Sequence, residues 1–222
     1  MKKYIFLSFL FFTISLCARA QKNPIEFGFQ SGVNINAVYG NSGLKKYTGT
    51  IAGLHVGVHI KMKMNQHFTV KAMLAYDQNG MAYRSLTFTN DGGNDLGTGD
   101  LLEKLNYLNL PVLAEYSFGK KIKFNVDAGF FAGYLLKSTA VQKIKEPVAS
   151  THTFTLTNRK SINFGVSAGA GLQIPLTSKI KLDLGIRDNL GLANIYKPQA
   201  SESGTIKTNS FSILAGLTFA IK

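Results

Sequence analysis

Ile122-Lys123-Phe124-Asn125-Val126-Asp127-Ala128-Gly129-Phe130 carries an apolar residue at every second position. Side chains alternate between the two faces of a β-strand, so this segment has one apolar face and one polar face. The same alternation recurs along the chain and predicts eight strands. They cover about residues 25–39, 54–61, 68–77, 108–118, 122–134, 162–173, 180–187 and 211–219. The chain is therefore expected to be all-β.

The connections between these strands alternate in length. Short ones span 62–66, 119–121 and 175–178, and long ones span 40–49, 84–104, 137–160 and 194–208. A soluble β-sandwich has no reason for this alternation, whereas an outer-membrane barrel has short periplasmic turns and long extracellular loops. Eight is also an even number, as bacterial single-chain barrels require. The sequence predicts an eight-stranded antiparallel transmembrane β-barrel of the outer-membrane type.

The first 20 residues have the features of a secretory signal peptide. Lys2 and Lys3 form a basic start, residues 4–16 are almost wholly apolar, and Ala18-Arg19-Ala20 provides a small-x-small cleavage site. An apolar core of about 13 residues is too short to span a bilayer as a helix. We expect a signal peptide at 1–20, a barrel domain at 21–222 and an outer-membrane location. Cleavage there would remove the only cysteine, Cys17.

The charge of the chain indicates its neighbours. The formal net charge is +13, and loss of Lys2, Lys3 and Arg19 with the signal leaves +10. An exported protein meets little nucleic acid, so no nucleic-acid partner is expected. Outer-membrane lipid, and the phosphates of lipopolysaccharide in particular, are the expected anionic neighbours. Further expected partners are the barrel-assembly machinery during insertion and an envelope protein.

The polar faces of the predicted strands indicate what fills the barrel. They carry five acidic and five basic residues. These are Glu26, Lys61, Lys71, Asp77, Glu115, Lys123, Asp127, Lys181, Asp183 and Arg187. Eight strands enclose a space just wide enough for side chains to fill, and an unpaired ion out of water costs several kcal/mol. The sequence therefore predicts a lumen closed by a network of ion pairs.

Three other sets of polar residues are candidate sites of chemistry. His55 and His59 share a face but lie roughly 13 Å apart along a strand, which favours lumenal hydrogen bonds over a shared metal ion. Residues 90–100 are rich in oxygen ligands, but they lack the spaced carboxylates of a calcium loop and are expected to form a polar loop. His152 has serine, threonine and Glu146 nearby, but nothing fixes a catalytic geometry. We predict no catalytic residue, metal site or cofactor.

Two further features concern single elements. Residues 139–145 and 151–160 predict a hairpin that extends beyond the membrane, with a basic face that could meet lipid phosphates or a partner. That face consists of Lys137, Lys143, Lys145, Arg159 and Lys160. Pro111 lies inside a predicted strand, where it cannot donate to the ladder, and is expected to mark a β-bulge.

Four stretches resemble a known family. They are Tyr107-Leu108-Asn109-Leu110-Pro111, Gly129–Tyr134, Gly165–Gly171 and Gly191–Ile195. On these, the chain resembles the PorT-like outer-membrane β-barrel proteins of the Bacteroidota over essentially the whole mature chain. The resemblance implies the barrel fold, and some relatives are linked to protein secretion. The expected function is a structural or interaction platform in the cell envelope, with a role as a secretion accessory. A narrow porin-like channel for ions or small solutes is the alternative, and a surface enzyme the third hypothesis.

Overall fold

The computed structural model describes residues 25–40, 48–89, 92–93, 95–146, 149–197 and 205–221. The expected signal peptide at residues 1–20 lies outside these ranges. Within them are ten strands: β1 Ile25–Tyr39, β2 Thr48–Gly49, β3 Ile51–Lys63, β4 Phe68–Thr89, β5 Asp95–Phe118, β6 Lys123–Glu146, β7 Ser150–Thr155, β8 Ile162–Pro175, β9 Ile180–Gly191 and β10 Lys207–Ile221. Among the described residues, no helix is long and apolar enough to cross a membrane.

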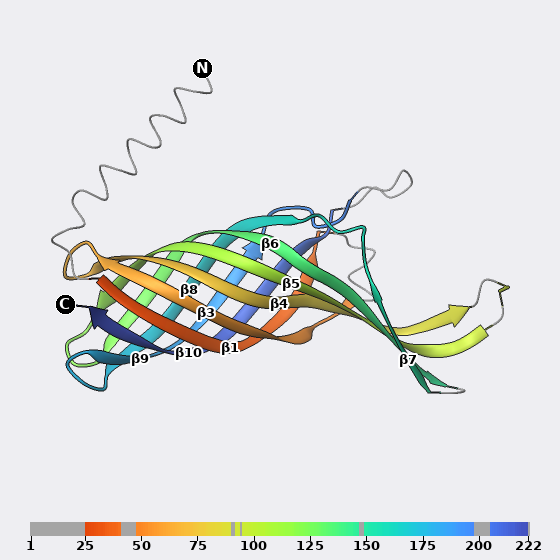
Figure 1. Ribbon diagram of the computed structural model, residues 1–222, viewed down its shortest axis with the longest axis horizontal. Coiled ribbons are helices and arrows are strands. Elements are labelled where there is room, and N and C mark those ends of the chain that lie inside the picture. Colours follow the sequence, from red (N-terminus) through yellow and green to blue (C-terminus); the bar gives the residue numbers. More distant parts are fainter. Residues whose placement is uncertain are drawn as a thin grey trace, which may run out of the picture.

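Eight of the strands close into an antiparallel ring (Figure 1). Their order is β4-β3-β1-β10-β9-β8-β6-β5, and pairing between β4 and β5 completes the circle. The remaining two are additions at the margin, because β2 pairs only with β4 and β7 only with β6. The eight-stranded antiparallel barrel predicted from the alternating pattern is confirmed. A closed ring has no free edge.

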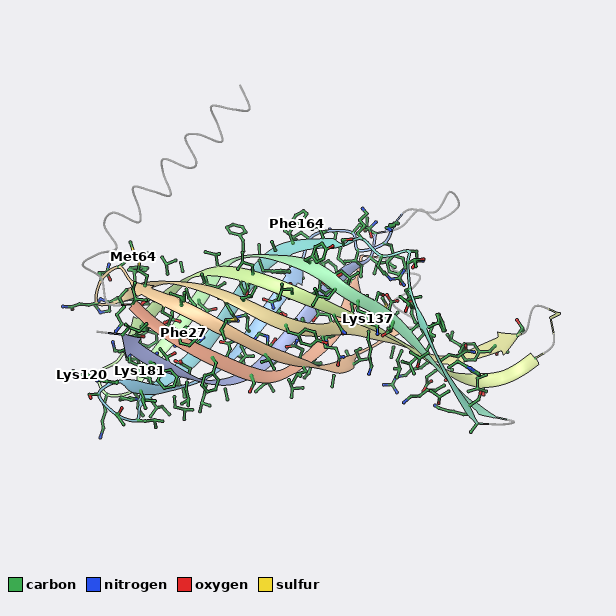
Figure 2. The ribbon with its side chains drawn as sticks, in the orientation of Figure 1. Phe27, Met64, Lys120, Lys137, Phe164 and Lys181 are labelled. Carbon is green, nitrogen blue, oxygen red and sulfur yellow. The ribbon has the colours of Figure 1, made fainter. Side chains whose placement is uncertain are left out.

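The barrel is apolar outside and polar inside. Along β1, Glu26, Gln30 and Asn34 are buried, whereas Phe29 and Val33 are about half exposed. The other strands continue the outer apolar row, and Phe27 and Phe164, labelled in Figure 2, are both substantially exposed. This arrangement is the reverse of a soluble protein and is what a lipid-facing surface requires. The alternation in the sequence therefore arises from the contrast between lipid and lumen.

Aromatic side chains gather on the exterior near the end with the short turns. Tyr116 contacts Phe68 and Phe118, with ring centroids 5.0 and 6.3 Å apart, and Phe118 lies 5.6 Å from Phe124. Met64, Lys120 and Lys181 lie at this same end (Figure 2). Outer-membrane barrels carry such girdles where the apolar band meets water. The short turns at this end assign it to the periplasmic side.

The expected long loop at 84–104 is wrong. Strand β4 continues to Thr89 and β5 begins at Asp95, so most of the segment is a hairpin. The expectation of a polar loop at 90–100 is also wrong, because the residues from Asp95 onward belong to β5. The segment lies beyond the lipid, so its two faces lack the contrast that marks the other strands.

Strands β4, β5 and β6 run on past the barrel as a projecting sheet, to which β7 adds a fourth strand (Figure 1). We call residues 84–89, 95–104, 137–146 and 150–155 the protruding sheet. Pairing of β6 with β7, from Thr139↔Thr155 to Ile144↔Ser150, confirms the hairpin predicted beyond the membrane. The register of β5 against β6 shifts between Asn106 and Tyr107, where Leu135 pairs with Tyr107 and Lys137 with Asn106. The bulge lies where the strands leave the barrel.

Pro111 does not mark a bulge. The pairing of β5 with β6 keeps one register through Pro111, which lies opposite Phe131. Against β4, pairing stops at Ala72↔Val112 and resumes at Ala75↔Asn109 without a shift. The expectation was therefore wrong, and the barrel accommodates the missing donor as a short gap in one ladder.

Candidate functional site

The periplasmic end of the lumen is held by a buried carboxylate between two lysines. Glu26 is 2% exposed, and its Oε1 lies 2.6 Å from Lys63 Nζ and 2.5 Å from Lys181 Nζ. The strands bring the three together because β1 pairs with both β3 and β10, and β10 with β9. Lys63 was missed in the sequence analysis, although it continues the inward row of Lys61 by two positions.

The next layer is organised around Lys61. Its ammonium group is buried and lies 3.3 Å from Glu115 and 3.6 Å from Asp183. Asp183 also accepts hydrogen bonds from Gln173, at 2.9 Å, and from Thr218. These contacts join β3, β5, β8, β9 and β10, so a single cation ties opposite walls of the ring together.

The middle of the lumen is less tightly paired. Arg187 lies 3.8 Å from Asp127, and its Nη1 lies 3.6 Å from the sulfur of Met73. Lys71 is 6% exposed and forms no ion pair with any described residue. Lys71, Asp127 and Arg187 line a cavity of about 30 Å³, together with Lys61. This volume is enough for a water molecule or two and not for a solute.

Nearer the extracellular side, Asp77 is the centre of a hydrogen-bond cluster. It accepts from Asn34 at 3.0 Å and from Asn109 at 2.6 Å, and it lies 2.6 Å from His55 Nδ1. The other ring nitrogen of His55 lies 2.8 Å from Gln30. Asp77 is thus held by an imidazole and two amides and not by one of the predicted bases.

The two lumen histidines serve different layers. His55 belongs to the Asp77 cluster, whereas Nε2 of His59 lies 2.9 Å from the Thr218 hydroxyl. The structure therefore gives both histidines the hydrogen-bonding roles predicted for them. The described residues contain no group of three or more His, Cys, Asp or Glu that could hold a metal ion.

The structure places all ten predicted charges on the lumen side of the wall but brings only some together. Glu26 pairs with Lys181, Lys61 with Glu115 and Asp183, and Asp127 with Arg187. The remaining three do not pair with one another. Asp77 has His55, Lys71 lies beside the cavity, and Lys123 is half-buried at the periplasmic mouth without an ion pair to a described residue.

The extracellular mouth is filled by an apolar cluster. Buried Leu105, Tyr107, Ile195 and Ile206 form it, with Val38, Leu135 and Tyr196 packed against them. These residues come from β5, β6 and β1 and from the connection between β9 and β10, so the cluster reaches across the ring. Backbone hydrogen bonds from Lys160 to Ile195 and from Ile195 to Ile206, at 2.8 and 2.9 Å, hold the covering segments. We call residues 156–161, 192–197 and 205–206 the cap.

A buried ion pair fastens the cap to β5. Arg159 donates from Nε and Nη2 to the two carboxylate oxygens of Glu103, the second at 2.6 Å. Their side chains are 5% and 2% exposed. The guanidinium also lies 3.5 Å from the centre of the Tyr196 ring, and the Tyr196 hydroxyl donates to Glu103 at 3.0 Å. Such bidentate pairs combine strength with fixed geometry.

The charge states in this group follow from its contacts. Burial favours a lower pKa for Arg159, but the hydrogen bond and charge of Glu103 outweigh it and raise the pKa. Burial, followed by the charge of Glu103, raises the pKa of Tyr196. At neutral pH Arg159 is therefore charged and Tyr196 is a neutral donor. Sequence reasoning missed Glu103, which continues the inward row of β5 past the membrane. Arg159 was placed on an exposed basic face, but it is buried.

The residues considered for catalysis are spread over the protruding sheet. His152 is exposed on β7 and pairs across the sheet with Gln142. Thr151 and Thr153 flank it and point to the opposite face of the strand. This arrangement is an ordinary strand surface and gives the surface-enzyme hypothesis no geometric support.

The family model described as outer membrane protein beta-barrel domain matches residues 19–197. Among solved structures, the chain is similar to Neisserial surface protein A, with 15% identity over 87% of this chain and 96% of that chain and a TM-score of 0.46. It is similar to OprG from Pseudomonas aeruginosa, with 10% identity over 90% of this chain and 97% of that chain and a TM-score of 0.49. It is also similar to Ail of Yersinia pestis, with 12% identity over 87% of this chain and 98% of that chain and a TM-score of 0.41. No curated protein matches the chain.

Proposed function

The chain belongs to the outer membrane protein β-barrel domain family and lies in the outer membrane, and on that premise we propose that it is an anchored platform. The barrel fixes the protruding sheet at the cell surface, where the sheet meets an envelope partner. The observation that carries this proposal is a lumen filled from end to end below a sheet that extends beyond the lipid. The finer assignment to the PorT-like proteins, and with it a role as a secretion accessory, is part of the proposal.

The filling of the lumen supports an anchor over a conduit. Successive layers are occupied by the Glu26 group, the Lys61 group, the Arg187–Asp127 pair and the Asp77 cluster. Above them lies the apolar cluster of the cap. Separating a buried ion pair is costly because each charge is then left unpaired away from water. The side chains of the lumen therefore favour a single closed arrangement of the barrel.

A narrow channel is the second candidate, and the middle layer favours it. Arg187 and Asp127 are loosely paired at 3.8 Å, and Lys71 lies beside a small cavity. Rearrangement of these three side chains would widen the lumen at one level. Conduction would also require the cap to move.

Planar-bilayer recording of the refolded, signal-free protein tests the two candidates. We expect no unitary steps from protein whose insertion is verified by protection from protease. Arg187→Met should lower stability to denaturant without producing conductance. Asp127→Asn removes the other charge of the same ion pair and should have the same effect. Reproducible steps from the wild type, altered in size or selectivity by either substitution, would replace the platform with the channel.

We also propose lipid and assembly partners for the barrel. Lys137 is exposed directly after Leu136, which is 53% exposed on the apolar band, and it lies where the barrel gives way to the protruding sheet (Figure 2). A lysine at that level suits the phosphates of lipopolysaccharide. The barrel-assembly machinery is the proposed partner during insertion. Retention of Lys137→Glu protein on lipopolysaccharide vesicles should fall relative to Lys137→Arg.

A further inference from the structure

The protruding sheet has two edges, and they differ in kind. The outer edge of a strand presents unpaired N–H and C=O groups, and proteins often block such edges with bulges or charges. The edge formed by β4 is blocked in this way. Its register against β5 shifts between Tyr83 and Leu86, and Ser85 has a φ of 55°. Asp100 accepts a hydrogen bond from the Ser85 amide at 3.2 Å and holds the irregular backbone.

The edge formed by β7 lacks these features. Its register against β6 is continuous from Ser150 to Thr155. The six residues Ser-Thr-His-Thr-Phe-Thr contain no proline, glycine, lysine or carboxylate, and most are β-branched or aromatic. In the described part of the chain, no strand pairs with the other side of β7. Strand β7 is therefore regular, pairs with β6 in a single register, and has an outer edge with no described partner strand.

The hydrogen-bond pattern shows which backbone groups are available. The Leu156 amide donates to Ser138 at 3.0 Å, which places residue 156 in a hydrogen-bonded pair with β6. Because such pairs alternate along an antiparallel ladder, every second residue of β7 also faces β6. The residues between them, Thr151, Thr153 and Thr155, turn their N–H and C=O groups away from β6. They form a ladder with no described partner.

The two faces beside this edge define the chemistry of a partner. Phe154 is 44% exposed and lies opposite Ala140, on the uncharged face that also carries Gln142 and His152. Thr151 lies opposite Lys143 on the other face, where Lys143 is exposed. The neighbouring Lys145 side chain is 64% exposed and already pairs with Asp100 at 2.8 Å, so Lys143 is the cation available to a partner. A matching strand therefore has apolar residues on one face and acidic residues on the other. A second copy of this chain paired through its own β7 would present threonines and the same basic face, and no acidic residue.

We propose that β7 binds an extended acidic–apolar segment of another protein by adding it as a further strand. Main-chain hydrogen bonds to Thr151, Thr153 and Thr155 supply affinity, and the two faces supply selectivity. The inference rests on the proposed platform function, because it names the partner chemistry of the sheet that the barrel anchors. A closed barrel has no edge within the membrane, so strand addition belongs to this extramembrane strand.

Fluorescence anisotropy of a labelled peptide of four Val-Glu repeats tests the proposal, using the whole protein in phospholipid nanodiscs. The charge-reversed Val-Lys peptide is the control, and we expect at least tenfold weaker binding for it. Thr153→Pro should weaken binding of the Val-Glu peptide at least tenfold, since proline removes the outward N–H and spares the ladder to β6. Thr153→Val keeps that N–H and should bind within about threefold of the wild type, because only the hydroxyl is lost.

Each outcome decides the matter. Equal binding of Thr153→Pro and Thr153→Val, or no binding of the Val-Glu peptide to the wild type, would overturn the proposal. If Thr153→Pro fails to fold, a Val-Glu peptide N-methylated at every residue replaces it, because methylation at alternate residues would leave one edge of the peptide free to pair. Retained affinity of that peptide for the wild type would also overturn strand addition. Conductance of the same protein in a planar bilayer separates the two proposals, because a conducting barrel that binds the peptide would refute only the platform function.

Discussion

Replacing Arg159 with methionine should release the cap from the extracellular mouth. The guanidinium holds both oxygens of Glu103, donates to the Tyr196 hydroxyl at 2.5 Å and covers the Tyr196 ring. Methionine retains much of the aliphatic stem but none of the donors. Glu103, which is 2% exposed beside Arg159, would keep only the Tyr196 hydroxyl to stabilise its charge.

The size of the effect follows from the burial of the pair. Removing one partner of a buried ion pair costs about 3–5 kcal/mol, because the other charge is left uncompensated. Solvent screening does little to reduce this figure, since both side chains are nearly inaccessible. At about 1.4 kcal/mol for each factor of ten, amides that exchange by opening of the cap should exchange roughly two to four powers of ten faster.

Hydrogen exchange measured on the protein in nanodiscs reads this out by residue. The amides of Lys160 and Ile195 report on the cap, because they donate to Ile195 and Ile206. Amides of the β8–β9 ladder serve as the internal reference and should not change. The double variant Glu103→Gln/Arg159→Met removes both charges and should lose less protection than Arg159→Met. Unchanged exchange at Lys160 and Ile195 in the single variant would refute the role given to the ion pair.

Further perturbations probe the membrane face, the ring and the sheet. Phe130→Arg should cost about 2–4 kcal/mol in vesicle-based urea unfolding, as expected near the bilayer midplane, whereas Phe130→Leu should cost under half as much. Gly165→Ala should cost about 1–3 kcal/mol, because its Cβ would lie 2.0 Å from a neighbouring backbone oxygen; an unchanged folding yield would contradict this. Hydrogen bonds from Lys145 and the Ser85 amide lower the pKa of Asp100. Protection of the Ser85 amide should hold above the usual aspartate pKa of about 4 and fall as pH drops through the lowered value, unlike in Asp100→Asn.

The sequence predicts the barrel well because each transmembrane strand separates two different surroundings. One face meets lipid and the other meets the lumen, so an apolar residue at every second position is a physical requirement. The segment Ile25–Tyr39 shows this, and its predicted bounds agree with β1. Where the strands leave the lipid, both faces meet protein or water. The contrast fades over residues 84–104, which were predicted to be a loop for that reason.

The candidate site is only partly predictable for a different reason. The alternation along each strand identifies which charged side chains point into the lumen. Which of them form ion pairs depends on strands that come together only when the ring closes. Lys71, Arg187 and Asp127 line the same cavity, but only Arg187 forms an ion pair with Asp127. Which of the two cations reaches the carboxylate depends on the stagger between the strands. Arg159 lies in an irregular segment and reaches Glu103 across 56 residues of sequence. No local pattern carries that contact.

The continuity of three strands links the membrane anchor to the protruding sheet. β4, β5 and β6 pass without interruption from the barrel wall into the sheet, and the Glu103–Arg159 pair binds β5 to the cap just above the lumen. A hinge between anchor and sheet would require the β4–β5 and β5–β6 ladders to break at one level. The two ladders shift register at different levels instead. The β5–β6 ladder shifts between Asn106 and Tyr107, and the β4–β5 ladder shifts between Tyr83 and Leu86. The open edge of β7 is therefore held at a fixed height above the membrane, so a partner strand would find its backbone ladder already ordered. Binding would then cost ordering entropy mainly on the partner's side.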